Sequence, residues 1–61
     1  MLFVLEIECD NAAFDDNHAA EVARILNELA DKIAASPDTL NYWLRDSNGN
    51  LVGAAEFFPE R

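Results

Sequence analysis

The stretch "CDNAAFDDNHAAE", residues 9–21, holds the densest group of side chains that could do chemistry. Its potential ligands or acid–base groups are Asp10, Asp15, Asp16, His18 and Glu21. A calcium-binding loop needs oxygen ligands at alternating positions and a glycine at the sixth, and this stretch has neither. A zinc or iron site needs several histidines or cysteines, whereas the whole chain has one of each. His18 and Glu21 are three residues apart, but no second pair of ligands completes a site.

The same residues are better explained as the acidic start of a helix. The carboxylate of Asp15 or Asp16 would accept hydrogen bonds from free N–H groups of the first turn, and Phe14 would pack just before it. Acidic side chains there also interact favourably with the positive end of the helix dipole. We therefore predict no metal site and no cofactor.

A thiol nucleophile formed by Cys9 and His18 is the second chemical possibility. Cys9, however, continues an alternating apolar pattern with Phe3, Leu5 and Ile7, which places it on the inward face of a strand. Buried cysteines in apolar surroundings are unreactive. The hydroxyl side chains have no base at a useful spacing, and the sequence has no glycine-rich phosphate loop. We predict that the protein is not an enzyme.

Three segments must position these residues. Period-two alternation over residues 2–9 predicts a strand. From about Asp15 to Ala35 the apolar period changes to three and four residues, which predicts an amphipathic helix that ends before Pro37. Its apolar stripe consists of Val22, Ile25, Leu26, Leu29 and Ile33. Residues 40–57 predict a hairpin, because Asn48-Gly49 favours a two-residue type I′ turn. That turn would pair Leu44 with Gly53, Tyr42 with Ala55, Leu40 with Phe57 and Arg45 with Val52.

These elements predict a single domain, residues 1–61, of the α+β class with the order β-α-β-β. We expect a three-stranded, mostly antiparallel sheet with the third strand in the middle and one helix packed on one face. The uncovered face would then carry several apolar side chains, namely Leu2, Val4, Trp43, Val52 and Phe58. Exposed apolar patches mark contacts with other molecules, so we expect a homodimer or a partner contact there, with Trp43 as a candidate.

The charge of the chain limits its partners. Twelve acidic residues against four basic ones give a formal net charge of -8. Phosphate backbones and anionic lipids repel such a chain, so we predict no direct nucleic-acid binding and no membrane binding. Basic protein surfaces are its natural partners. A single cysteine and an apolar start without basic residues, "MLFVL", indicate a cytoplasmic protein without a signal peptide.

Several carboxylates fall away from the apolar stripe of the helix. Glu21, Glu28 and Asp31 share its outward side, with Asp15 and Asp16 at its start. Such a ridge can imitate a phosphate track for a protein with a basic groove, although solubility explains the same charges. These five carboxylates are the candidate contacts for that partner.

The chain resembles small acidic proteins encoded by bacteriophages, prophages and bacteria. The resemblance lies in "ECDNAAF" at residues 8–14, "EVARILNELADKI" at 21–33 and "LRDSNGNLVGAAEF" at 44–57. It implies a shared fold, and it extends to inhibitors of host defence such as anti-CRISPR and anti-restriction proteins. We therefore expect a module that inhibits a host nucleic-acid-binding protein by occupying its basic surface. The alternative is a regulatory or structural module that acts through its exposed sheet face, by homodimerisation or by docking to one protein.

Overall fold

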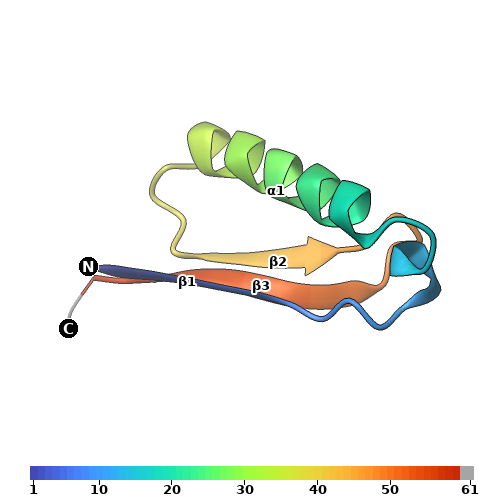
Figure 1. Ribbon diagram of the computed structural model, residues 1–61. Helices are drawn as coiled ribbons and strands as arrows, with labels where there is room; N and C mark the ends of the chain where they lie inside the picture. The colour runs from blue at the N-terminus through green and yellow to red at the C-terminus, as the bar shows by residue number, and fades with distance from the viewer. Residues whose placement is uncertain (60–61) are drawn as a thin grey trace.

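The computed structural model describes residues 1–59, which form one helix and one sheet (Figure 1). The elements are β1 (Leu2–Ile7), a short 3-10 helix η1 (Ala12–Phe14), α1 (His18–Ala35), β2 (Asn41–Arg45) and β3 (Leu51–Phe58). The sheet has the order β1-β3-β2, and both outer strands are antiparallel to β3. The predicted β-α-β-β fold with the third strand in the middle is confirmed. No helix within residues 1–59 is both long enough and apolar enough to cross a membrane.

The helix begins three residues later than predicted, and a different side chain caps it. Asn17 is the N-cap, and its side-chain oxygen accepts a hydrogen bond of 3.0 Å from the Ala20 N–H. The prediction that Asp15 or Asp16 caps the helix is wrong. The reason is η1, which turns the chain just before the helix and places Phe14 in the core.

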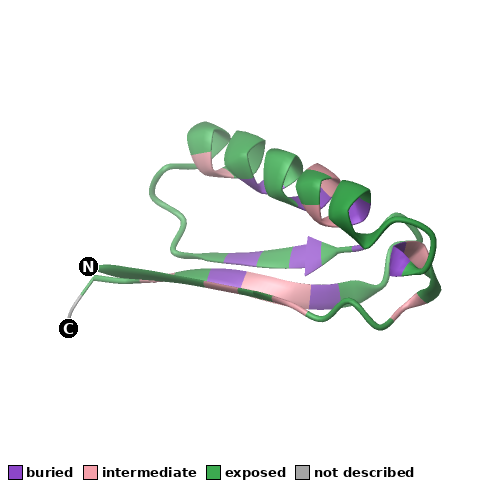
Figure 2. Cartoon of the chain, in the orientation of Figure 1, coloured by how far each residue is buried: buried purple, intermediate pink, exposed green. Residues whose placement is uncertain are grey.

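The core lies between α1 and one face of the sheet. Its buried side chains are Phe14, Ile25, Leu29, Tyr42, Leu44, Val52 and Ala55. Figure 2 shows that burial is concentrated where α1 faces the sheet, whereas β1 is exposed along most of its length. Tyr42 is in the core as predicted, and its hydroxyl donates a hydrogen bond of 2.8 Å to the carbonyl of Ser36 at the helix end.

The hairpin turn differs from the predicted type I′ turn. Within residues 1–59, Gly49 alone has a positive φ, at 85°, whereas a type I′ turn needs positive φ at Asn48 as well. The Asp46 N–H donates to the Asn50 carbonyl at 2.9 Å, and the Gly49 N–H donates to the Asp46 carbonyl at 3.0 Å. The loop therefore has three residues, 47–49, with a glycine in the left-handed conformation at its end.

The longer loop shifts the pairing of β2 with β3 by one residue at the loop end only. Tyr42 pairs with Ala55 and Leu44 with Gly53, as predicted, but Arg45 pairs with Leu51 and not with Val52. The irregularity lies between Leu44 and Arg45, and Val52 belongs to the core, with only 6% of its surface exposed. The prediction that Val52 lies on the uncovered face is therefore wrong.

The end of β1 also differs from the prediction. The strand ends at Ile7, and Cys9 lies beyond it, exposed and outside the core. The Glu8 N–H still donates to the Val52 carbonyl, at 2.8 Å, before the chain turns towards η1. Cys9 is therefore not an inward-facing strand residue. Close by, β1 approaches β3 so tightly that a Cβ at Gly53 would lie 1.9 Å from the carbonyl oxygen of Glu6.

Candidate functional site

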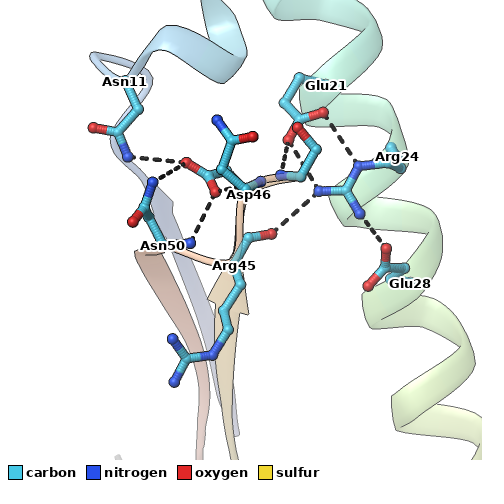
Figure 3. Close-up of polar contacts among 9 residues, drawn as sticks. Asn11, Glu21, Arg24, Glu28, Arg45, Asp46 and Asn50 are labelled. Carbon is cyan, nitrogen blue, oxygen red and sulfur yellow. Dashed lines mark hydrogen bonds and ion pairs between the residues drawn. The ribbon is translucent and has the colours of Figure 1, made fainter.

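Glu21 is held at the junction between α1 and the hairpin turn (Figure 3). Only 8% of its surface is exposed. Its carboxylate accepts hydrogen bonds from Arg24 Nε at 3.2 Å, from Arg24 Nη2 at 2.9 Å and from the Ser47 N–H at 2.7 Å. The hydrogen bond from Arg24 holds the pKa of Glu21 below its ordinary value, against the effect of burial. The prediction that Glu21 faces outward as a partner contact is therefore wrong about its exposure.

Asp46 is the second buried carboxylate, and it organises the loop end of the hairpin (Figure 3). It accepts hydrogen bonds from the backbone N–H groups of Asn48 and Asn50, both at 2.9 Å, and from the Asn11 side chain at 3.0 Å. Burial by itself would raise the pKa of Asp46, but the hydrogen bonds from Asn50, Asn11 and Asn48 outweigh it and lower the pKa. Asp46 thus joins the segment before η1 to the turn.

Both carboxylates accept several hydrogen bonds from other groups of the same chain. Within residues 1–59, no buried side-chain nitrogen or oxygen lacks a hydrogen-bond partner. Ser47 offers Glu21 its backbone N–H, so the pair is not a nucleophile beside a base. We assign Glu21 and Asp46 to holding the helix, the turn and the η1 segment together.

The other candidate carboxylates are on the surface. Asp15 and Asp16 lie in the exposed turn before α1, and Glu28 and Asp31 are exposed on the helix. Arg24 forms an ion pair with Glu28 as well as with Glu21, so two of the predicted acidic contacts share one cation. The acidic ridge of the helix is consequently shorter and less charged than the sequence indicated.

His18 and Cys9 are both exposed. No group of three or more histidine, cysteine or acidic side chains within the described part of the chain is arranged to hold a metal ion. His18 is the first residue of α1, whereas Cys9 lies between β1 and η1.

The sheet face opposite α1 is uncovered (Figure 1). The register places Glu6, Ala54 and Trp43 in one row across β1, β3 and β2, and Val4, Glu56 and Asn41 in the next row. Trp43 exposes 58% of its surface, and Leu2, Val4, Leu51 and Phe58 are also exposed. We call this surface the open sheet face.

A shallow hollow lies on the open sheet face beside Trp43. Its lining includes Trp43, Ala54, Leu51, Glu6 and Glu8. The floor is low because Ala54, the central residue of the row, has a small side chain and the neighbouring Gly53 has none. The hollow therefore combines an aromatic wall with carboxylates on the opposite side.

Part of this site was visible in the sequence. Period two predicted that Trp43 lies opposite the core face and beside Ala54, and the register confirms both. Glu6 and Leu51 were missed as neighbours of Trp43. Their place depends on the pairing of β1 with β3 and on the shift at Arg45, which no local pattern encodes.

The chain was compared with protein-family models, with curated proteins and with solved structures, and nothing matches it.

Proposed function

We propose that this protein is a non-enzymatic interaction module that docks one basic protein on its open sheet face. The single observation that carries the proposal is Trp43, which exposes 58% of its surface on the face that no helix covers. Tryptophan is enriched among the residues that dominate binding energy at protein interfaces. An exposed tryptophan beside a hollow is therefore the best anchor that this chain offers.

Charge selects the partner. Glu6 and Glu56 lie on the same face as Trp43, and the chain as a whole carries a net charge of -8. A complementary surface would contain an apolar or flat group for Trp43 and lysine or arginine around it. Nucleic-acid-binding proteins have such basic surfaces. The resemblance to small phage proteins extends the proposal to inhibition of a host defence protein of this class, such as a CRISPR-Cas component.

A second candidate is mimicry of nucleic acid by the acidic helix. It is favoured by the exposed carboxylates Asp15, Asp16, Glu28 and Asp31. It is weakened because Glu21 is buried and because Arg24 is paired with Glu28. In this case the partner would contact α1, and Trp43 would have no part in binding.

The test compares two variants as baits in a bacterial lysate. Trp43→Ser removes the proposed anchor, and the double variant Glu28→Lys with Asp31→Lys reverses the helix charge. Leu26→Ser is the matched control, because Leu26 is also an exposed apolar residue but lies on the helix. We expect Trp43→Ser alone to lose a captured basic protein.

The captured protein is then titrated against the purified domain. Trp43 is the only tryptophan of the chain, so its fluorescence reports docking directly. A shift of its emission on binding supports the open sheet face. Loss of binding in the double lysine variant, with Trp43→Ser unaffected, would transfer the site to the helix.

A further inference from the structure

The two edges of the sheet are not equally protected. At the β2 edge, α1 packs against the strand, and the carbonyl of Arg45 accepts a hydrogen bond of 3.2 Å from Arg24 Nη2. At the β1 edge, the register with β3 is continuous, and the strand has no proline, lysine or bulge. Natural proteins use those devices to prevent edge strands from pairing with other chains. β1 lacks them, apart from one charged residue, Glu6.

The outward backbone groups of β1 can be identified from the ladder. The Glu8 N–H donates to the Val52 carbonyl. Because backbone groups alternate in direction along a strand, the N–H and C=O groups of the even-numbered residues of β1 point towards β3. Phe3, Leu5 and Ile7 then direct their N–H and C=O groups away from the sheet. One of these groups, the Ile7 carbonyl, accepts a hydrogen bond of 3.9 Å from the exposed Cys9 thiol.

Both faces of β1 carry exposed apolar side chains. Phe3, on the helix side of the sheet, exposes 41% of its surface, and Val4, on the open sheet face, exposes 38%. Phe3 is exposed although its ring packs, tilted, against the ring of Phe57 with a centroid distance of 4.5 Å, because α1 packs against β2 and not over β1. A strand with free backbone groups and apolar side chains on both faces is a template for another strand.

We propose that β1 pairs with β1 of a second copy of this chain. The two strands would be antiparallel about a two-fold axis perpendicular to the sheet, giving a six-stranded sheet in the order β2-β3-β1-β1-β3-β2. A two-fold interface requires a self-complementary surface, and β1 meets this condition. With Leu5 opposite Leu5, Phe3 faces Ile7, and all three outward-pointing residues form hydrogen-bonded pairs.

The same register also separates the charges. Glu6 lies opposite Val4, so no carboxylate faces another. A shift that places Glu6 opposite Glu6 would set like charges side by side, which is unfavourable in a strand pair. A shift the other way, with Val4 opposite Val4, would leave Ile7 opposite Met1, outside the strand. Pairing centred on Leu5 is therefore the register that fits β1.

This dimer goes beyond the proposed function, because it uses the edge of the sheet and leaves the open sheet face free. Each copy carries a net charge of -8, so the copies repel one another at low salt. Added salt screens that repulsion, and dimerisation should strengthen with ionic strength.

The experiment measures the mass of the full chain by sedimentation over a range of protein and salt concentrations. Phe3→Pro removes one outward N–H per copy without removing a bond to β3, and proline is tolerated at such edge positions. Phe3→Leu is the matched control, because it also loses the aromatic ring but keeps the N–H. We expect a dimer for the parent and for Phe3→Leu. For Phe3→Pro we expect a dimer dissociation constant roughly 10- to 100-fold higher, from two lost hydrogen bonds.

Hydrogen exchange gives a second measurement that needs no variant. The amide protons of Phe3, Leu5 and Ile7 face solvent in a single copy and should become protected as the protein concentration rises. A parent chain that stays monomeric at every concentration overturns the proposal. So does a dimer in which these three amides exchange freely, or one that Trp43→Ser dissociates and Phe3→Pro does not.

Discussion

Replacement of Gly49 by alanine tests the hairpin turn. Gly49 has a φ of 85°, and a Cβ built on it has no other atom within 4 Å. The cost of Gly49→Ala is therefore conformational and not steric. The left-handed conformation costs an L-residue about 1–2 kcal/mol, and the lower entropy of the unfolded alanine chain returns about 0.4–1 kcal/mol. We expect a net loss of about 1 kcal/mol.

The neighbouring residue provides the internal control. Asn48 does not have a positive φ, and its N–H, which donates to Asp46 Oδ1 at 2.9 Å, is retained in alanine. Asn48→Ala should therefore change the free energy of unfolding by no more than about 0.5 kcal/mol. In a type I′ turn both residues need positive φ, and both substitutions would be costly.

Thermal and urea unfolding, followed by the helix signal in circular dichroism, separate the two cases. In a domain of this size, a loss of 1 kcal/mol lowers the melting temperature by about 4–8 °C. We expect that decrease for Gly49→Ala and almost none for Asn48→Ala. Equal decreases for the two variants would contradict the three-residue loop and support the two-residue turn.

Three further predictions concern packing and pH. Gly53→Ala should lower the free energy of unfolding by about 1–3 kcal/mol or more through overpacking, because the alanine Cβ would lie 1.9 Å from the backbone oxygen of Glu6. A urea midpoint equal to that of the parent would show that the strands are not so close. Tyr42→Phe should cost about 0.5–1.5 kcal/mol in the same assay, since the Ser36 carbonyl loses its donor, and a neutral result would show that water replaces it. The folded chain lowers the pKa values of Glu21 and Asp46 from the ordinary 4.5 and 3.8. The two ionised carboxylates therefore stabilise the fold above pH 4.5 and 3.8, respectively, and this contribution is lost as the pH falls through their lowered pKa values. Urea midpoints should therefore depend less on acidic pH in the double variant Glu21→Gln with Asp46→Asn than in the parent.

The order of helix and strands could be predicted because it follows from the spacing of apolar residues within each segment. Alternation over β1 and the hairpin, and the 3.6-residue period of α1, are each set by the residues of one segment. The pairs Tyr42–Ala55 and Leu44–Gly53 follow from the same alternation. The shift at Arg45 could not be predicted, because it depends on a loop of three residues in place of two.

The burial of Glu21 and Asp46 was not predicted from the sequence, and the reason differs between the two residues. Glu21 stands four residues before Ile25 and eight before Leu29, so the helical period itself places it on the buried side, and Arg24 follows at a spacing suited to an ion pair. Glu21 was nevertheless predicted to be exposed, because acidic residues usually are. Asp46 was missed for another reason, since its partner Asn11 lies far away in sequence and only the folded chain brings the two together.

The buried polar contacts and the exposed apolar side chains lie in different parts of the molecule. Glu21, Arg24 and Asp46 secure α1, the turn and the β2 edge, whereas β1 and the open sheet face leave apolar side chains uncovered. A chain of this length buries a limited fraction of its surface, so contacts at β1 and at Trp43 would add burial that the single copy lacks. The two contacts respond to salt in opposite directions. Pairing of two chains that each carry -8 should strengthen with added salt, whereas docking to a basic protein should weaken. Because the edge and the face are distinct surfaces, a β1 dimer would present two copies of Trp43 on one continuous face, and a partner with two matching sites would bind it more tightly than it binds the Phe3→Pro monomer.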